Sequence, residues 1–395
     1  MTIDFLAEAQ ALKGEMVARR RDLHAHPEMG FAEYRTAGII AQALTELGME
    51  VQTGVGKTGV VGLLGGDRPG PTVMMRFDMD ALPIEEANAV DYASQNPGVM
   101  HACGHDGHVT IGLAVAKLLH AHRQQINGTL KFVFQPAEEG LGGALAMVAD
   151  GVIDRPRQDV ALGLHLWNEQ PVGWVSAAPG PVMAGAELFE IKLIGSGGHG
   201  AAPYQTKDPV TAAAQIVTAL QTVVSRNVDA RHGAVISVTQ IHGGDAFNVI
   251  PGVVTLGGTI RTFDLGVREI VLRRFEEIVR GVAAAMQCEA EIRLQKATSA
   301  VINDEEVAGR VRELAATMPG AFTQIRDDER TMGSEDYGEL VGNAPSCYFF
   351  VGSADPARGL NYPHHHPRFD FDEQALVTGA ALMAATAAGY VFEAE

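Results

Sequence analysis

The stretch Met100-His101-Ala102-Cys103-Gly104-His105-Asp106-Gly107-His108 holds three histidines, one cysteine and one aspartate within nine residues. Directly after it comes an apolar run, Val109–His120, whose spacing predicts a helix. Thiolate and imidazole groups bind zinc and neighbouring metals, and glycine lets the backbone bend so that both can face one ion. The stretch therefore predicts a metal-binding loop in front of a helix. The alternative is a polar loop that caps the helix through Asp106, and for His101 and His108 individually we favour a structural role.

The segments on either side of this loop predict an α/β layout. Apolar residues recur at helical spacing over 5–23 and 33–47. Short apolar, β-branched runs predict buried strands at Val60–Leu64, Thr72–Phe77, Leu130–Phe134 and Val160–Leu164. Since two of the gaps between these strands can hold helices, we expect a largely buried sheet covered by helices.

The rhythm of the sequence changes between residues 187 and 303. Strands are predicted at Leu188–Ile194, Ala234–Ile241, Val253–Arg261 and Ala290–Leu294, with helices at Pro209–Val224 and Val267–Met286. This β-α-β-β-α-β order is that of a small ferredoxin-like unit. We therefore predict a mixed-sheet α/β/α domain over 1–186 and 304–395, with a ferredoxin-like α+β domain inserted at 187–303. The first domain resumes with the helix Asp304–Ala316, the strand Cys347–Val351 and the helix Glu373–Tyr390.

The composition narrows the class of protein. A chain of 395 residues exceeds the usual size of one hydrophobic core, which favours two domains or an insertion. The formal charge of −18 repels phosphate backbones and anionic membrane surfaces, so we expect no nucleic acid partner. Three scattered cysteines fit a reducing cytoplasm better than a disulfide framework. We see no export signal and no run of roughly 18 apolar residues, so we expect a cytoplasmic protein without a membrane span.

Carboxylates follow two of the predicted strands. Glu138 and Glu139 lie in the segment Phe134-Gln135-Pro136-Ala137-Glu138-Glu139-Gly140, at the end of a predicted strand. One of two adjacent carboxylates can bind a metal while the other holds a water as general base, although such a pair alone is usually a solvated turn. Asp78 and Asp80 follow the strand that ends at Phe77, and Asp80 can orient a metal-bound imidazole.

Histidines supply two further candidates. His165 lies at the end of a buried strand within Gly163-Leu164-His165-Leu166-Trp167, where a satisfied core residue is the alternative. The segment Tyr362-Pro363-His364-His365-His366-Pro367 places three histidines between prolines. This segment is either a source of ligands or a rigid loop.

The segment Gly54-Val55-Gly56-Lys57-Thr58-Gly59 satisfies the G-x-G-x-x-G pattern of dinucleotide-binding proteins. That pattern must open a helix, whereas a β-branched run follows here, and Val51 stands where a phosphate-binding loop needs glycine. We therefore predict a hairpin turn. Since the chain also lacks the Gly-x-Ser-x-Gly and His-Glu-x-x-His patterns, serine-hydrolase and zincin mechanisms have no support.

Taken together, these motifs resemble the metallopeptidase M20 family, in the branch of aminoacylases, hippurate hydrolases and auxin-conjugate hydrolases. The resemblance covers nearly the whole chain. It is carried by MRFDMDALPIEE, MHACGHDGH, FQPAEEGLGGA, GLHLW, GSGGHGAAP, NVIP, GTIRT, GSEDYG and HHPRFDFDE.

The resemblance implies two divalent metal ions, with zinc favoured by the thiolate ligand and manganese or cobalt also possible. The implied metal ligands are Cys103, His105, Glu139, His165 and His365, with Cys103 between the two ions. His365 is chosen because the family's ligand stands two residues before a proline, here Pro367. Glu138 resembles the general base.

The resemblance also assigns roles in the inserted domain, which it makes a lid and dimerisation domain. His199 lies in the motif Gly197–Pro203, whose histidine stabilises the oxyanion at a partner subunit's active site. Asn248 and Arg261 match positions that contact the substrate, and the planar fork of arginine suits a carboxylate. A homodimer, or an oligomer built from dimers, is therefore expected.

We predict an amidohydrolase that converts an N-acyl amino acid, such as hippurate or an N-acetyl amino acid, into a carboxylic acid and a free amino acid. A metallo-carboxypeptidase or dipeptidase acting on short peptides is the alternative within enzymes. A non-catalytic metal-dependent binding protein is the alternative in another class. The presence of Glu138 beside a complete ligand set argues against that last reading.

Overall fold

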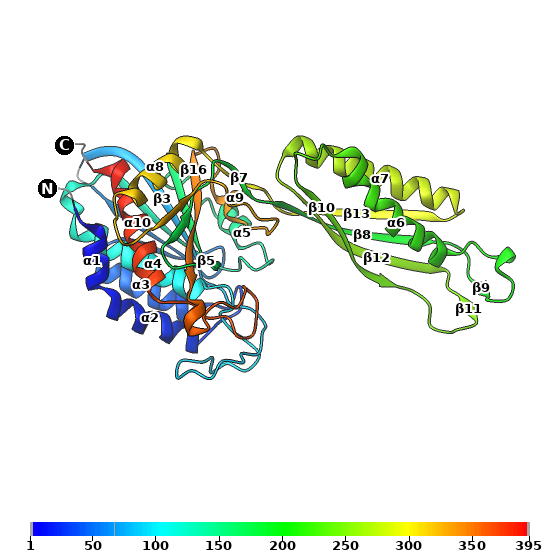
Figure 1. The fold of residues 1–395 in the computed structure, drawn as a ribbon, viewed down its shortest axis with the longest axis horizontal. Helices are drawn as coiled ribbons and strands as arrows, with labels where there is room; N and C mark the ends of the chain where they lie inside the picture. The colour runs from blue at the N-terminus through cyan, green and yellow to red at the C-terminus, as the bar shows by residue number, and fades with distance from the viewer. Residues whose placement is uncertain (1–2, 67, 393–395) are drawn as a thin grey trace. The chain divides into compact units, whose positions relative to one another are not determined.

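The computed structural model describes residues 3–66 and 68–392, which form two compact units (Figure 1). The first unit runs up to Val182, then covers Ile302–Glu329, and resumes at Asp336. The second unit covers Met183–Val301 and Arg330–Glu335. Each unit has its own hydrophobic core.

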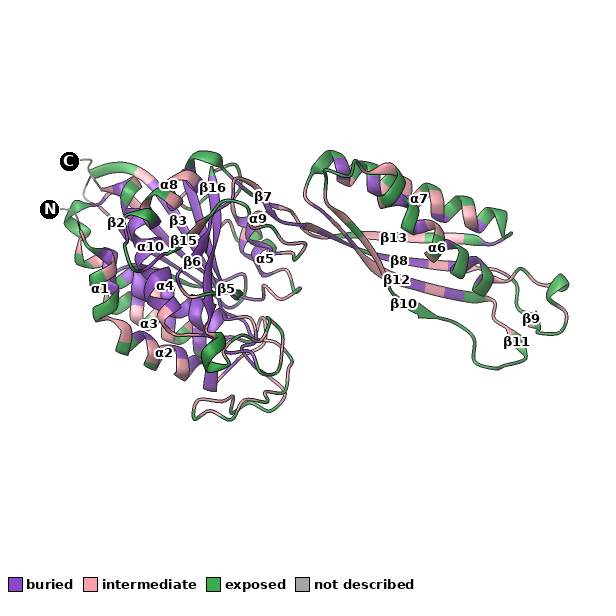
Figure 2. Ribbon diagram, in the orientation of Figure 1, coloured by how far each residue is buried: buried purple, intermediate pink, exposed green. Residues whose placement is uncertain are grey.

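A mixed eight-stranded sheet forms the centre of the first unit, in the order β1-β2-β4-β3-β5-β16-β6-β15. Its strands are β1 (Glu50–Val55), β2 (Gly59–Gly65), β3 (Arg68–Asp78), β4 (Asn127–Gln135), β5 (Val160–Pro171), β6 (Trp174–Ser176), β15 (Gln324–Arg326) and β16 (Ser346–Ala354). The pairs β4/β3, β3/β5 and β5/β16 are parallel. Strand β16 is buried along its whole length, and Figure 2 shows the sheet as the most buried layer of the unit.

Helices cover this sheet, and several of them pack directly on its central strands. They are α1 (Phe5–Ala11), α2 (Lys13–Ala25), α3 (Tyr34–Glu46), α4 (His105–Ala121), α5 (Gly143–Ala149), α8 (Glu305–Ala316), α9 (Tyr337–Leu340) and α10 (Gln374–Val391), with 3-10 turns at Arg123–Gln125 and Pro356–Arg358. Helix α4 lies close to the sheet at Gly112, where a Cβ would come within 2.7 Å of Phe77 and Phe134. The absence of a side chain at this position allows the close packing. This close approach brings the start of α4 to the ends of β3 and β4.

The second unit has a four-stranded antiparallel sheet in the order β10-β12-β8-β13. Its elements are β8 (Gly185–Ile194), β9 (Gly198–His199), α6 (Pro209–Asn227), β10 (Ala234–His242), β11 (Val249–Ile250), β12 (Val253–Thr262), α7 (Leu265–Ala285) and β13 (Glu289–Thr298), with a 3-10 turn at Pro203–Gln205. Short strands β7 (Gly180–Met183) and β14 (Val301–Asn303) pair where the chain enters and leaves this unit. The order of strands and helices confirms the predicted ferredoxin-like pattern and the mixed α/β class.

Two helices differ from expectation. The single helix predicted over 5–23 is interrupted at Leu12, so that α1 and α2 are separate. Helix α4 begins at His105, not at Val109, because Gly104 adopts a left-handed conformation (φ 92°) and turns the chain directly into the helix. His105 and His108 therefore lie on the first turn of a helix, not in the loop before it.

The expectation that no segment could span a membrane needs one correction. Helix α10 is long and apolar enough by length and composition, because the alanines and glycines of its 18 residues are interrupted by no charge. However, 83% of this window is buried inside the protein, as in the core helix of a globular fold.

Candidate metal centre

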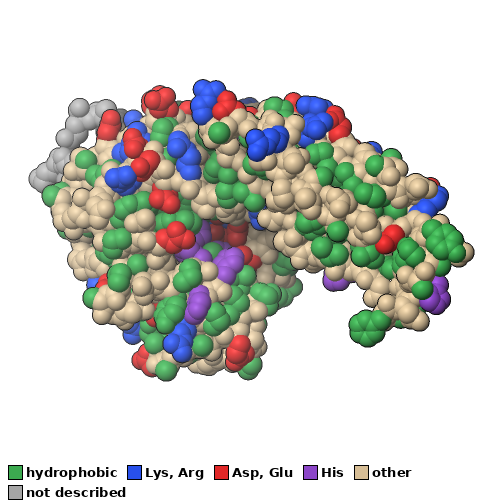
Figure 3. Space-filling model, turned by 45° about the vertical axis from the view of Figure 1, so that its right-hand side comes forward, with side chains coloured by type: hydrophobic (Ala, Val, Ile, Leu, Met, Phe, Trp, Pro, Cys, Tyr) green, Lys and Arg blue, Asp and Glu red, His purple; other side chains and the backbone are tan. Residues whose placement is uncertain are grey.

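Five side chains at one end of the first unit's sheet form what we call the ligand cluster. Its members are Cys103, His105, Glu139, His165 and His365. The ligand atoms of Cys103, His105 and His165 lie within 4.8 Å of one another, and so do those of Cys103, Glu139 and His365. The two groups share Cys103, so its thiolate can face two ions. In Figure 3, histidine and acidic side chains gather on one part of the first unit's surface.

The ends of the central strands bring this cluster together. Cys103 and His105 lie at the start of α4, and Glu139 lies in the turn after β4. His165 lies on β5, with its Nε2 3.5 Å from the Cys103 sulfur. His365 comes from the loop before α10, with its Nε2 3.3 Å from Oε1 of Glu139. Sites in open α/β sheets usually lie outside the carboxyl ends of the strands, as this one does.

Backbone contacts orient two of the imidazoles. Nδ1 of His105 donates to the carbonyl oxygen of Asp80 at 2.9 Å, and Nδ1 of His165 donates to that of Leu166 at 2.7 Å. In both rings the Nε2 lone pair is then left for a metal, as is usual for metal-binding histidines. Nε2 of His105 is buried and has no hydrogen-bond partner within the described part of the chain. Because such buried atoms are rare, the cluster fits a metal ion.

The charges of the cluster favour an added cation. Hydrogen bonding with Cys103 and Glu139 raises the pKa of His365 to about 10. Burial lowers the pKa of His165, which keeps that imidazole neutral and able to bind a metal. Burial and the nearby carboxylate of Glu139 raise the pKa of the Cys103 thiol. A divalent ion would reverse this effect, because a coordinating thiol loses its proton.

Of the three consecutive histidines, only His365 belongs to the ligand cluster. It has a left-handed backbone (φ 65°), and its amide donates to the carbonyl oxygen of Ala102. Nε2 of His364 instead accepts the amide hydrogen of Asn168, and Nδ1 of His366 accepts that of Arg368. Backbone amides therefore occupy a ring nitrogen in each of the two neighbours.

The two remaining candidates of the first unit lie at the edge of the ligand cluster. The ligand atom of Glu138 lies within 4.8 Å of those of His105 and Glu139. Asp80 is buried, and its Oδ2 accepts the amide hydrogen of Glu139 at 3.0 Å. Oδ1 of Asp80 lies 3.3 Å from Nδ1 of His105. Asp80 thus contacts two members of the ligand cluster.

Sequence reasoning missed the part played by Asp78. This carboxylate accepts from Arg76 at 2.6 Å and from Nδ1 of His108 at 2.5 Å. Nε2 of His108 accepts the amide hydrogen of Leu166, so both ring nitrogens are occupied and His108 supports the neighbouring strand. The spacing of two aspartates in Asp78-Met79-Asp80 was the available signal.

A second buried network lies at the start of α4. Asp106 accepts from Arg20 at 2.9 Å and lies 2.8 Å from Nδ1 of His24. Burial alone would raise the pKa of Asp106, but the guanidinium of Arg20 holds it well below its usual range. His101 is buried, and burial lowers its pKa to about 4. These groups sit inside the protein, which agrees with the structural role favoured for His101.

The other three predicted site residues belong to the second unit. His199 is exposed on β9, and its Nδ1 accepts the amide hydrogen of Ala201, which leaves Nε2 as the proton-bearing donor. Asn248 is exposed in front of β11. Arg261 is half-buried on β12, and burial lowers the pKa of its guanidinium.

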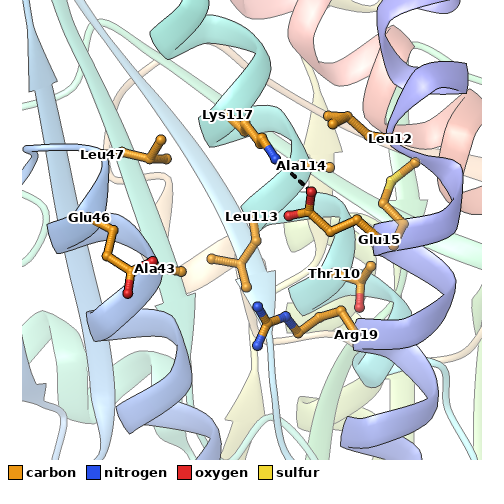
Figure 4. A pocket seen from close by; sticks show the side chains of 11 residues that line it. Leu12, Glu15, Arg19, Ala43, Glu46, Leu47, Thr110, Leu113, Ala114 and Lys117 are labelled. Carbon is orange, nitrogen blue, oxygen red and sulfur yellow. Dashed lines mark hydrogen bonds and ion pairs between the residues drawn. The ribbon is translucent and has the colours of Figure 1, made fainter.

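Two other features are distinct from the ligand cluster. The segment 54–59 is the predicted turn between antiparallel strands β1 and β2, with left-handed residues at Gly54, Gly56 and Lys57. A cavity of about 210 Å³ lies among α2, α3 and α4 (Figure 4). It is lined by Leu12, Met16, Leu47 and Leu113 together with charged side chains, and no member of the ligand cluster lines it.

Comparison with known proteins identifies the family. The model of peptidase family M20/M25/M40 matches residues 74–389. YhaA of Bacillus subtilis, named as an amidohydrolase, is 42% identical over 95% of this chain and 94% of its own length. The hippurate hydrolase of Campylobacter jejuni is 36% identical over 98% of this chain and 100% of its own length.

A solved structure agrees with these relatives. The YXEP protein of Bacillus subtilis, described as a dinuclear metal binding peptidase from the M20 family, is 33% identical. It covers 97% of this chain and 99% of its own, with a TM-score of 0.84. The chain is therefore an enzyme, a hydrolase that belongs to peptidase family M20/M25/M40.

Proposed function

We propose that this enzyme is a two-metal amidohydrolase that removes the acyl group from N-acyl amino acids. The observation that carries the proposal is the ligand cluster, in which two groups of metal-binding atoms share the sulfur of Cys103. Cys103, His105, Glu139, His165 and His365 would hold the two ions. Zinc is favoured because thiolate and imidazole are its preferred ligands, with manganese or cobalt as alternatives.

Two divalent ions would supply a water of lowered pKa and polarise the amide carbonyl of the substrate. Glu138 is proposed as the general base, because its carboxylate lies next to His105 and Glu139. It takes a proton from the attacking water and then gives that proton to the leaving amine. Asp80 keeps His105 and Glu139 in place.

Three residues of the second unit have proposed roles in the reaction. Arg261 and Asn248 are proposed to bind the substrate carboxylate, for which a planar guanidinium is well suited. Nε2–H of His199 is proposed to donate to the oxyanion, in keeping with the acceptor role of its Nδ1. We propose that residues 187–303 form a lid and dimerisation domain, that His199 serves the partner subunit of a homodimer, and that the enzyme is cytoplasmic.

A second candidate is a carboxypeptidase or dipeptidase acting on short peptides. The description of the similar YXEP protein as a peptidase favours it. The same base and ligands would serve both reactions, because only the acyl group of the substrate differs. The two candidates therefore differ in substrate preference, not in mechanism.

The substrate test compares kcat/KM of the metal-loaded enzyme for hippurate, N-acetyl amino acids and dipeptides. We expect N-acyl amino acids to be preferred. Hippuramide is the matched control, since it keeps the scissile amide but lacks the carboxylate that Arg261 would bind. Faster turnover of dipeptides would replace the first candidate by the second, and equal turnover of hippurate and hippuramide would remove the carboxylate site.

The dimer proposal is tested by mixing two inactive chains, Glu138→Ala and His199→Ala, after dissociation and reassociation. In a mixed dimer, the chain that keeps Glu138 can receive an intact His199 from its partner. Random pairing should then restore about a quarter of wild-type activity. No recovery, with subunit exchange confirmed by labelling, would contradict the assignment in trans.

A further inference from the structure

The turn that carries Glu138 and Glu139 begins at a residue with an unusual backbone. Ala137 has φ 53°, in the left-handed region that residues with a Cβ rarely adopt. Glu138 follows it directly, so the peptide between the two sets the direction of the Glu138 side chain. Such a conformation persists only where the surrounding structure holds it.

A buried carboxylate holds this backbone. Oε1 of Glu33 accepts the amide hydrogen of Ala137 at 2.9 Å, and the side chain of Glu33 is fully buried. The carbonyl oxygen of Ala137 accepts the amide hydrogen of Gly143 at 3.0 Å. Both backbone groups of Ala137 are therefore engaged.

The side chain of Glu33 is itself hydrogen-bonded by Thr58, a residue of the glycine-rich turn at 54–59. Its hydroxyl donates to Oε2 of Glu33 at 2.5 Å, and its side chain is buried. The turn packs closely on the segment before Ala137, since a Cβ at Gly59 would lie 3.0 Å from Cδ of Pro136. The glycines of this turn thus bring Thr58 to Glu33, a role that needs no nucleotide.

A second buried carboxylate holds the other side of the turn. Asp80 accepts the amide hydrogen of Glu139 at 3.0 Å. Glu138 therefore lies between two anchored amides, that of Ala137 bound to Glu33 and that of Glu139 bound to Asp80. Loss of Glu33 would free only the first of them.

We infer that Glu33, supported by Thr58, is a positioning residue that keeps Ala137 in the left-handed conformation and so aims Glu138 at the substrate water. The inference rests on the proposed function, in which Glu138 is the general base. Because Asp80 still anchors Glu139, loss of Glu33 should impair turnover more than metal binding. This separates the role of Glu33 from a general contribution to folding.

The main test measures kcat, KM and metal content of Glu33→Ala and Glu33→Gln. In Glu33→Ala we expect kcat to fall by about 10- to 100-fold, the range for losing a supporting partner, with metal content unchanged. Glu33→Gln should stay near wild type, because its amide oxygen can accept from Ala137 and its amide nitrogen can donate to Thr58. The kcat of Thr58→Val should lie between those of Glu33→Ala and Glu33→Gln.

A double variant tests the backbone explanation. Glycine adopts positive φ without the penalty that a Cβ imposes. Ala137→Gly should therefore restore part of the kcat lost in Glu33→Ala. Glu28→Ala is the matched control, because the carboxylate of Glu28 accepts the amide hydrogens of Arg35 and Thr36 at the start of α3 instead of an amide of the turn. This control should keep wild-type kcat.

Glu138→Gln in the same assay separates the two proposals. Wild-type kcat in folded Glu33→Ala beside an inactive Glu138→Gln overturns the inference and leaves the proposed function intact. Full activity of Glu138→Gln removes the general base and with it both proposals. If Glu33→Ala does not fold, Thr58→Val decides, since a wild-type kcat in that variant also overturns the inference.

Discussion

His105 and His165 of the ligand cluster differ in exposure from the tip of the second unit, which we define as β9 and residues 247–250. His105 and His165 are buried, and each donates to a backbone carbonyl that fixes the ring. At the tip, His199 and Asn248 are exposed, and Phe247 stands fully in solvent. Contacts within the first unit therefore fix these two imidazoles, whereas these side chains of the tip are exposed to solvent.

This difference predicts different consequences of substitution. In the ligand cluster, the five side chains lie close to one another, and His105 and His165 are also buried, so a substitution should change metal content or stability as well as activity. At the tip, few intramolecular contacts are lost, so a substitution should change activity alone. Measuring activity, metal content and Tm together therefore tests the comparison.

The largest expected effect concerns Glu138. Glu138→Gln should keep near-normal metal content and lose turnover by roughly 10² to 10⁴, the range for removing a general base. Glu139→Gln should instead lose metal, because an amide is a poorer ligand than a carboxylate. Elemental analysis and initial rates check both variants. Reversed phenotypes would exchange the roles of base and ligand.

The second effect concerns the tip. His199→Ala should lower kcat by about 10² to 10³, the range for removing one oxyanion donor. Its Tm and metal content should match the wild type, because the exposed ring supports little of the fold. A fall in Tm comparable to the fall caused by a buried substitution would break the contrast between the two regions.

The third effect distinguishes the three consecutive histidines. His365→Ala should weaken metal binding beyond the roughly 10- to 100-fold range seen when an outer partner of a ligand is removed. His366→Ala is the matched control and should bind metal normally, since its Nδ1 accepts a backbone amide. Competition with a chelator measures the affinities. Equal, small losses of metal affinity in His365→Ala and His366→Ala would show that the fifth metal ligand is not His365.

The smallest effect concerns the proposed carboxylate site. Arg261→Lys should raise KM for hippurate by about tenfold, equivalent to about 1.4 kcal/mol of binding free energy. Lysine keeps the charge but loses the planar fork. The same variant should leave hippuramide hydrolysis unchanged. An equal change in KM for both compounds would assign Arg261 to the fold and not to the carboxylate.

Most of the fold was predictable from periodicity. The strands and helices of the second unit follow from alternating and helical apolar spacing, which local sequence encodes directly. The separation of α1 from α2 at Leu12 was not predicted, because apolar residues recur at helical spacing on both sides of it and Gly14 alone does not end a helix. Strands β6 and β15, each three residues long, carry too few residues to show a period.

The candidate site was predictable as a set of motifs but not as a network. The ends of β3, β4 and β5 were expected to carry polar side chains, and the structure brings the members of the ligand cluster within reach of one another. The contacts of Asp78 with His108 and of Glu33 with Ala137 depend on backbone conformations and distant segments. No local pattern shows that a carboxylate at position 33 will meet an amide at position 137.

The measurement that tests the account most directly is stepwise metal reconstitution of chelated protein, with metal per chain and hydrolysis of hippurate followed together. We predict that the metal-free enzyme is inactive and that activity returns as two ions bind per chain. Cys103→Ser, which removes the sulfur shared by both groups, should bind less metal because an alkoxide forms far less readily than a thiolate. Full activity in protein shown by elemental analysis to hold no metal would contradict the account.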